Sequence, residues 1–166
     1  MITLLLATMI VVPMLGEWWV STRNERELRA QGAVEPAGDV YGLMQVLYPA
    51  SFIAILIESA RRDPYPDVLV AAGFTIFVAA KALKYWAITS LGVRWTFRVL
   101  VPPGSSAITA GPYRVLGHPN YIAVIGELLG AALMAHAIVA GPPAIAVFGI
   151  LILIRIRIEE RALGLR

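Results

Sequence analysis

The chain has 166 residues, of which 58% are hydrophobic and only 15% are charged. A soluble domain carries about 25% charged residues, so this composition excludes an ordinary soluble protein and predicts one membrane domain over residues 1–166. The net charge of +3 is too small for a nucleic-acid partner, and the absence of cysteine excludes disulfides, thiolate catalysis and cysteine-ligated metals.

Five apolar stretches predict an all-α integral membrane protein with five transmembrane helices. The first stretch covers about residues 2–20 and has no basic residues at its start, so we expect a retained span and not a cleaved signal. Glu17, Trp18 and Trp19 crowd its far end, and tryptophans at that position are typical of a membrane interface.

Polar residues 21–39 separate the first span from a second one over residues 40–57. Ser21 or Asn24 is suited to cap a short helix that Gly32 would end, and a solvated loop is the alternative. Such a helix would lie on the membrane surface and help to close a site.

The third span is expected from residue 67 to about residue 91. At the helical rise it would be about 37 Å long, so its end would leave the hydrocarbon. Lys81 and Lys84 lie three residues apart on one face of this helix. We predict that both lysines reach out to lipid headgroups; binding of a substrate is the alternative.

A long irregular segment, residues 92–118, leads into two further spans over about residues 119–140 and 144–156. Glycine and proline at residues 141–143 predict a tight turn, so the last two spans would form an antiparallel hairpin over residues 119–156. A charged tail follows the hairpin.

The arginines between the predicted spans fall into two unequal groups. The smaller group is Arg61 and Arg62. The larger group is expected on the opposite side of the membrane: Arg23, Arg26, Arg29, Arg94, Arg98, Arg114, Arg155, Arg157, Arg161 and Arg166. Because basic loops remain in the cytoplasm, this asymmetry predicts an outside N-terminus and a cytoplasmic C-terminus.

The segment from Gly111 to Tyr121 is polar, contains several glycines and prolines and runs directly into an apolar stretch. Pro119 suits the first turn of a helix, which places His118 at the helix mouth. The N-terminus of a helix has unpaired N–H groups that favour anions. With the charged tail at the same end of the hairpin, the segment predicts a cofactor site at the cytoplasmic surface. Its candidate residues are Tyr113, Arg114, His118, Pro119, Asn120, Tyr121, Glu159 and Glu160.

Glu127 lies eight positions after Pro119, about 12 Å along an apolar helix. A lone carboxylate in hydrocarbon is costly, so we expect Glu127 to face the bundle interior and to have a partner, for a functional or a structural reason. His136 is expected near the outer face. Two distant histidines do not form a metal site, and we expect no metal.

Three motifs together resemble the isoprenylcysteine carboxyl methyltransferase family, whose members are multispan enzymes that use S-adenosylmethionine (SAM). The motifs are Gly111-Pro112-Tyr113-Arg114, His118-Pro119-Asn120-Tyr121 and Glu159-Glu160-Arg161-Ala162-Leu163. The resemblance covers roughly residues 94–166, which would form the SAM-binding core. Residues 23–26 and 32–35 look like a small bacterial branch that includes O-methyltransferases of alkylpyrones and alkylresorcinols.

The resemblance also implies roles for single residues. SAM would be held by Tyr113, His118, Pro119, Tyr121, Glu159 and Glu160. The tail arginines, Arg155 and Arg157, would lie near the methyl acceptor. Relatives usually have arginine before the His-Pro pair, where this chain has Gly117, so Arg114 or Arg157 would supply that charge.

The sequence therefore predicts a SAM-dependent O-methyltransferase in a bacterial inner membrane, with its active site facing the cytoplasm. Its acceptor would be a lipidic phenol or pyrone, or a prenylated cysteine carboxylate, that enters from the membrane lipids. A carboxylate needs an arginine to place it, whereas a phenol or enol benefits from a base, for which Glu127 is the candidate.

Two alternatives remain open. One is an NADPH-dependent membrane reductase of a related multispan fold, in which Arg94 and Arg98 are available for the extra phosphate. The other is a non-enzymatic scaffold whose charged loops bind a partner.

Overall fold

The computed structural model describes residues 2–104 and 108–164, so Arg166 and the predicted turn at Ser105 and Ser106 lie outside the described residues. This part of the chain contains five α-helices and two short 3-10 helices, and its β-structure is one isolated bridge between Val34 and Val101. The helices are α1 (Ile2–Ala30), α2 (Tyr41–Arg62), α3 (Val68–Leu91), α4 (Pro119–Met134) and α5 (Gly141–Ala162), with η1 (Gly92–Arg94) and η2 (Gly111–Arg114) between α3 and α4.

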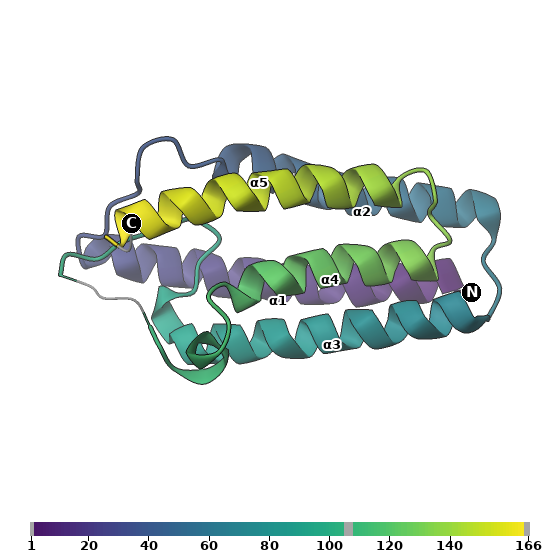
Figure 1. Cartoon of the computed structure of the whole chain (residues 1–166), viewed down its shortest axis with the longest axis horizontal. Helices are drawn as coiled ribbons and strands as arrows, with labels where there is room; N and C mark the ends of the chain where they lie inside the picture. The colour runs from purple at the N-terminus through teal and green to yellow at the C-terminus, as the bar shows by residue number, and fades with distance from the viewer. Residues whose placement is uncertain (1, 105–107, 165–166) are drawn as a thin grey trace.

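The five helices lie side by side and alternate in direction, which places the two termini at opposite ends of the bundle (Figure 1). Within the described residues, four helices are long and apolar enough to cross a membrane: α1, α2, α3 and α5. The fifth, α4, has 16 residues and is shorter. The prediction of an all-helical integral membrane protein is confirmed. The predicted number of five membrane spans is not, because α4 is shorter than the other four helices.

The first helix continues well beyond its predicted end. The alternative of a helix that Gly32 ends is right for residues 21–30, which are helical and are followed by Gly32 at φ +80°, but this helix is a continuation of α1 and not a separate one. Ser21 and Asn24 are buried inside α1 and cap nothing. The Ser21 hydroxyl accepts a hydrogen bond from the N–H of Phe97 at 2.8 Å. The amide of Asn24 donates to the carbonyls of Gly92 (3.1 Å) and Trp95 (2.8 Å). The polar end of α1 therefore anchors the segment that follows α3.

The turn between α4 and α5 lies earlier in the chain than predicted. Helix α4 ends at Met134, residues 135–140 form the turn, and Pro142 and Pro143 lie in the first turn of α5. Proline fits there because the first N–H groups of a helix have no intrahelical partner. The antiparallel hairpin is confirmed, and α5 extends to residue 162, so the charged tail is helical.

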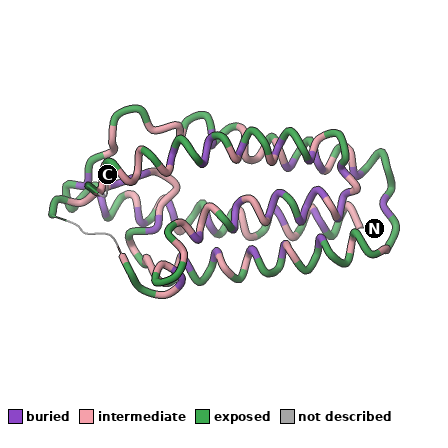
Figure 2. Tube along the Cα trace, in the orientation of Figure 1, coloured by how far each residue is buried: buried purple, intermediate pink, exposed green. Residues whose placement is uncertain are grey.

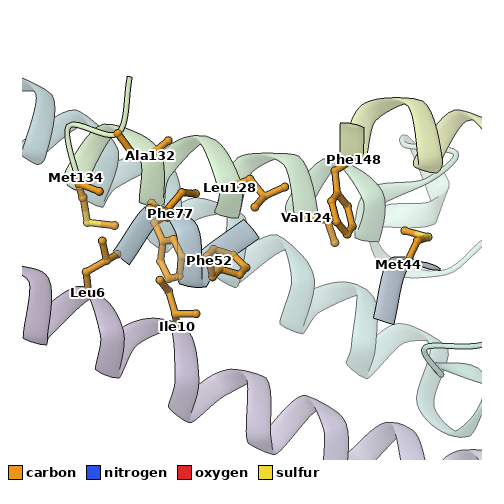
Figure 3. Close-up of a cluster of buried hydrophobic side chains, with 14 of the residues drawn as sticks. Leu6, Ile10, Met44, Phe52, Phe77, Val124, Leu128, Ala132, Met134 and Phe148 are labelled. Carbon is orange, nitrogen blue, oxygen red and sulfur yellow. The ribbon is translucent and has the colours of Figure 1, made fainter. Parts of the chain in front are cut away.

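The hydrophobic core runs along the inside of the bundle, with buried positions facing inward and exposed positions facing outward (Figure 2). All five helices contribute to it (Figure 3); its members include Leu6, Ile10, Phe52, Phe77, Val124, Leu128, Met134 and Phe148.

Helices α3 and α4 approach each other most closely. A Cβ atom added at Gly73 would lie 2.7 Å from the carbonyl oxygen of Gly130, and one at Gly126 would lie 2.8 Å from the Cβ of Ala80. Small residues that allow helix backbones to touch are typical of packing inside membranes. This contact fixes α4 relative to α3 and so fixes the position of the α4 N-terminus.

Candidate functional site

The N-terminus of α4 is set back from the end of the bundle that α5 and the polar part of α1 reach (Figure 1). We call this end, at the left of Figure 1, the site end. His118 is the residue before α4, and Pro119 is its first residue, as predicted. Residues 92–118 complete the connection at this end, and the interior space next to the α4 N-terminus is where the cavities described below lie.

Four polar side chains from α4, its N-cap and α5 form a cluster at the site end, which we call the end cluster: His118, Tyr121, Glu159 and Glu160. The hydroxyl of Tyr121 donates to Glu159 at 2.8 Å. The His118 Nε2 lies 3.3 Å from Glu160 Oε1, and its ring stacks on that of Tyr121 with centroids 5.6 Å apart. The predicted meeting of the His-Pro motif with the Glu-Glu pair is thus present.

A cavity of about 100 Å³ lies against the end cluster, and we call it the end cavity. The predicted site residues that line it are Tyr113, His118, Asn120, Tyr121, Arg155 and Glu159. Burial, reinforced by the negative charge of Glu159, raises the pKa of Tyr113 well above its ordinary value of 10.0. Tyr113 therefore remains a neutral phenol at physiological pH and can donate a hydrogen bond.

Other predicted residues lie outside this cavity. Arg114 and Arg157 are exposed, and Pro119 is buried in the first turn of α4. None of these three lines the end cavity. Gly117 is exposed, and a Cβ added there would have no neighbour within 4 Å, so the fold does not require glycine at this position.

Gly111, the first residue of the motif, is required by the fold. Its φ is +57°, and a Cβ atom there would lie 1.9 Å from the hydroxyl oxygen of Ser90 on α3. Only glycine combines this conformation with such a close approach. Gly111 thereby brings η2, and Tyr113 with it, close against the end of α3.

A second and larger cavity, of about 350 Å³, lies deeper between the helices, and we call it the lipid-side cavity. Its apolar walls include Met14, Met44, Val124 and Phe148. Three lining residues from α1 and α2 are exposed on the surface of the bundle: Leu15, Trp18 and Gln45. The cavity thus reaches the surface between α1 and α2, a face that membrane lipids would cover.

The two cavities share one wall. Five residues line both of them and form what we call the shared wall: Trp95, Thr96, Asn120, Tyr121 and Arg155. The indole N–H of Trp95 donates to the side-chain oxygen of Asn120 at 3.2 Å. One ligand in each cavity would therefore meet at this hydrogen-bonded pair.

Arg155 is the buried cation of the shared wall. Its guanidinium donates to the carbonyl of Phe97, lies 3.7 Å from a carboxylate oxygen of Asp39, and contacts the sulfur of Met44 at 3.5 Å. Its Nε is buried and has no hydrogen-bond partner among the described residues. Because a buried donor without a partner is costly, this N–H is suited to a ligand.

Four charged side chains from three helices meet inside the bundle, and we call them the buried ion cluster: Glu17, Lys81, Lys84 and Glu127. Lys81 and Lys84 each lie 2.7 Å from Glu17, and 3.0 and 3.1 Å from Glu127. Tyr48 donates to Glu127 at 2.6 Å. The prediction that Glu127 faces inward with a partner is confirmed, and the prediction that both lysines reach the headgroups was wrong. A lysine that finds carboxylates in the interior need not extend to the interface.

At the opposite end of the bundle, the Nε2 of His136 lies 3.2 Å from a carboxylate oxygen of Asp67, the N-cap residue of α3. The described residues contain no group of three potential ligands that could hold a metal ion. His136 lies in the turn between α4 and α5 and contacts the connection between α2 and α3, at the end of the bundle opposite to the end cluster.

Arg98 ties the segment after α3 to the end of α1. It contacts Glu25 at 3.4 Å and Glu35 at 2.8 Å, and Arg29 also pairs with Glu35 at 3.1 Å. Burial alone would raise the pKa of Glu35, but hydrogen bonds from the two arginines outweigh it and hold that pKa below 4.5. Of the two arginines considered for an NADPH phosphate, Arg98 is thus already paired with carboxylates.

The family model of isoprenylcysteine carboxyl methyltransferases matches residues 71–164, more than half of the chain. The chain belongs to this family. Membership indicates a membrane methyltransferase, and the match covers α4, α5, the end cluster, the whole shared wall and most of α3.

Two bacterial proteins are similar to this chain over most of their length. YpbQ of Bacillus subtilis strain 168, described as uncharacterized, is 30% identical over 159 residues, which are 96% of this chain and 95% of YpbQ. An uncharacterized protein of Haemophilus influenzae is 25% identical over 146 residues, which are 87% of this chain and 85% of the length of that protein. No solved structure matches the chain. Both relatives are in line with a small bacterial branch of the family.

Sequence reasoning missed several residues of this methyltransferase-family site. Trp95 and Thr96 were read only as part of an irregular segment, and Glu17 only as the end of a span. The apolar helices did carry a usable signal, because two lysines and two glutamates in them must be paired somewhere in the interior. Glu127 itself lines neither cavity; Tyr48 and Lys84, which contact it, line the lipid-side cavity.

Proposed function

We propose that the protein is a SAM-dependent O-methyltransferase that acts on a lipophilic acceptor within the membrane. The observation that carries this proposal is the shared wall between the more polar cavity at the site end and an apolar cavity open between α1 and α2. Methyl transfer requires the donor and acceptor atoms to be held in contact and in line. A wall reached from both cavities is the place where ligands from water and from lipid would meet.

The residues of the end cavity fit the charges of SAM, which supplies a methyl group on a positively charged sulfur and carries a carboxylate and an ammonium. Glu159 offers a carboxylate for the ammonium. The buried Nε of Arg155 offers a donor for the carboxylate. At the start of α4 the N–H of Asn120 is the second candidate, because Pro119 has no N–H and those of Tyr121 and Ile122 donate to the carbonyl of His118. The cavity of about 100 Å³ is below the roughly 300 Å³ at which small-molecule pockets begin, so binding would have to widen it.

The lipid-side cavity fits the apolar chain of an acceptor. An alkyl or isoprenoid chain could pass from the lipid into these apolar walls without exposure to water, because lipid tails and apolar side chains are alike in polarity. Its head group would then reach the shared wall. There Trp95 and Asn120 would orient the head group and exclude water, which is the main task in a methyl transfer. The acceptor would be a lipidic phenol or pyrone, or an isoprenylcysteine carboxylate.

We also propose on which side of the membrane the site end lies. The site end carries the large group of arginines, whereas Arg61 and Arg62 lie at the opposite end. By the positive-inside rule the site end would face the cytoplasm of a bacterial cell. Cysteines introduced at Arg62 and Gly104 test this: a membrane-impermeant thiol reagent should label the first in intact cells and not the second, and the reverse pattern would contradict it.

Calorimetric titration of the purified protein in detergent tests the function. SAM and S-adenosylhomocysteine should bind, and NADPH should not. With methyl-labelled SAM, label should pass to a long-chain alkylresorcinol or to N-acetyl-S-farnesylcysteine. If SAM does not bind the wild-type protein, the proposed function is wrong; NADPH binding would favour the reductase instead.

A further inference from the structure

The ion pair of Asp39 with Arg155 is looser than the pairs of the buried ion cluster. Nη2 of Arg155 and the nearest carboxylate oxygen of Asp39 are 3.7 Å apart, although the two side chains are only 6% and 4% exposed. In the buried ion cluster the corresponding distances are 2.7–3.1 Å. Because charge-assisted hydrogen bonds of this kind are about 2.7–2.9 Å long, Asp39 lies beside the guanidinium without a hydrogen bond to it.

Each side chain of this pair also keeps one buried polar atom without a partner. These atoms are Nε of Arg155 and Oδ1 of Asp39, neither of which has a hydrogen bond to any described residue. The other carboxylate oxygen, Oδ2, accepts a long hydrogen bond from the N–H of Val99 at 3.4 Å. A complete pair of arginine and carboxylate has two parallel N–H···O bonds. The pair is therefore incomplete, and a buried donor and a buried acceptor without partners are costly.

Asp39 lies near Nη2, one of the two nitrogens that form the guanidinium edge containing Nε. A carboxylate binds such an edge through both nitrogens. Nη2 also donates to the carbonyl of Phe97, and Nη1 contacts the sulfur of Met44. A ligand carboxylate that binds Nε would therefore also reach the nitrogen beside which Asp39 lies.

We propose that Asp39 is a resident counter-ion of Arg155 that the carboxylate of SAM replaces when SAM binds. This inference rests on the proposed function, in which Arg155 contacts that carboxylate. Without a ligand, Asp39 balances a buried cation that is otherwise costly in a membrane protein. With SAM present, two carboxylates meet one guanidinium, and their repulsion weakens the binding of SAM. Asp39 acts through Arg155 and is a positioning residue, and it lies outside the residues 71–164 that the family model matches.

Replacement of Asp39 by the ligand also loosens one wall of the end cavity. Asp39 belongs to the connection between α1 and α2, and this connection is joined to the wall by the bridge between Val34 and Val101. Arg155 of α5 holds Asp39, and through it the connection, against the cavity. A ligand that frees Asp39 as it binds therefore helps to widen a cavity of about 100 Å³.

One matched pair of ligands and one matched pair of variants test this role. The ligands are SAM and decarboxylated SAM, which keeps the sulfonium and the ammonium and lacks only the carboxylate. The first variant is Asp39→Asn, which removes the counter-ion at nearly constant size. The control is Glu27→Gln, which removes an exposed carboxylate from α1 at the same end of the bundle. Calorimetry on the full-length protein in detergent measures the affinities.

We expect Asp39→Asn to bind SAM about 10- to 100-fold more tightly than the wild type does, as the loss of one competitor for a charged group allows. Its affinity for decarboxylated SAM should not rise, and Glu27→Gln should raise neither affinity. Unchanged or weaker SAM binding by Asp39→Asn, or an equal gain for both ligands, would overturn the proposal. A wild type that binds no SAM would contradict the proposed function instead.

A second measurement applies if Asp39→Asn is unstable because its buried arginine lacks a counter-ion. SAM should then raise the melting temperature of this variant more than that of the wild type, because a ligand stabilises most the protein that binds it most tightly. Decarboxylated SAM should not do so. Failure of SAM to stabilise the variant, or an equal effect of the two ligands, would refute the role of Asp39.

A double variant tests whether Asp39 acts through Arg155. Asp39→Asn combined with Arg155→Gln removes both charges, so no buried charge of the pair is left alone. In this background SAM should bind no more tightly than it binds Arg155→Gln alone, since coupled residues lose their mutual effect when one of them is removed. A gain as large as that of Asp39→Asn in the wild type would show that Asp39 acts elsewhere.

Discussion

The buried ion cluster and the end cluster each pair two glutamates with basic side chains, in two different surroundings. In the buried cluster the side chains are 2–12% exposed, and each charge contacts two opposite charges. In the end cluster the side chains of His118, Glu159 and Glu160 are 16–31% exposed. Charges in hydrocarbon must be paired with opposite charges within the protein. Charges at the membrane interface can instead be hydrated, and a ligand can replace that water.

This contrast separates a group that holds the helices together from one suited to bind a cofactor. Removal of a charge from the buried cluster should therefore affect stability first, and removal from the end cluster should affect ligand affinity first. The predictions below test that separation, from the largest expected effect to the smallest.

Glu127→Ala should destabilise the protein by about 3–5 kcal/mol, because it leaves two buried lysines with one carboxylate between them. Unfolding in detergent with increasing denaturant measures the loss. Lys84→Met combined with Glu127→Gln, which keeps the cluster neutral, is the matched control and should lose less. A loss below about 1 kcal/mol for Glu127→Ala would contradict the structural role of the cluster.

His118→Ala should weaken SAM binding about 10- to 100-fold, since it removes a ring that stacks on Tyr121 and contacts Glu160. Glu160→Ala should act in the same direction. Calorimetry measures the affinity, and the melting temperature of both variants should stay close to that of the wild type. Arg161→Ala, an exposed change on the same helix, is the control; an equal loss there would point to a general effect of charge.

Gly117→Arg places a cation before the His-Pro pair, where the resemblance to the family leads us to expect arginine. It should be tolerated because the position is exposed and a Cβ there has no neighbour within 4 Å. A cation beside the end cavity should raise SAM affinity about two- to fivefold, the usual worth of a partly exposed charge. Gly117→Ala, which adds no charge, should leave the affinity unchanged; if it unfolds the protein, the local packing is not as described.

The contact between Glu35 and the two arginines should give a small pH dependence of stability. The folded pKa of Glu35 is below 4.5, so its contribution is complete above about pH 4.5 and is lost as the pH falls through the folded pKa. Because the pair is partly exposed, the effect should be about 1 kcal/mol at most. Unfolding measured between pH 6 and about pH 3 should show a smaller acid decrease for Glu35→Gln than for the wild type; identical curves would refute the assignment.

The membrane class, the hairpin and the start of α4 could be predicted from the sequence because each depends on local chemistry. The low charge content excludes a soluble domain, and a proline directly before an apolar stretch is typical of the first turn of a helix. The meeting of His118 with Glu159 and Glu160 could also be predicted, since a hairpin of two adjacent helices places these residues at one end.

Other predictions failed where the relevant neighbours are distant in the sequence. The polar pattern after residue 20 left both a loop and a separate short helix open, because its partners, residues 92–98, cannot be recognised from the pattern itself. Lys81 and Lys84 looked like headgroup ligands because a side chain's alternatives depend on which helices surround it. The prolines at 142 and 143 were compatible with either a turn or a helix start, and the packing of α5 against α4 favours the helix.

The sequence by itself determined that this protein is helical, lies in a membrane and carries the motifs of a methyltransferase family, because composition, proline position and motif spacing are local properties. Only the tertiary structure decided which charges pair, which residues separate the two cavities and which lysine lines the larger one. These depend on how helices far apart in the chain are packed. The close contact of α3 with α4 sets that packing, and no short stretch of sequence specifies it.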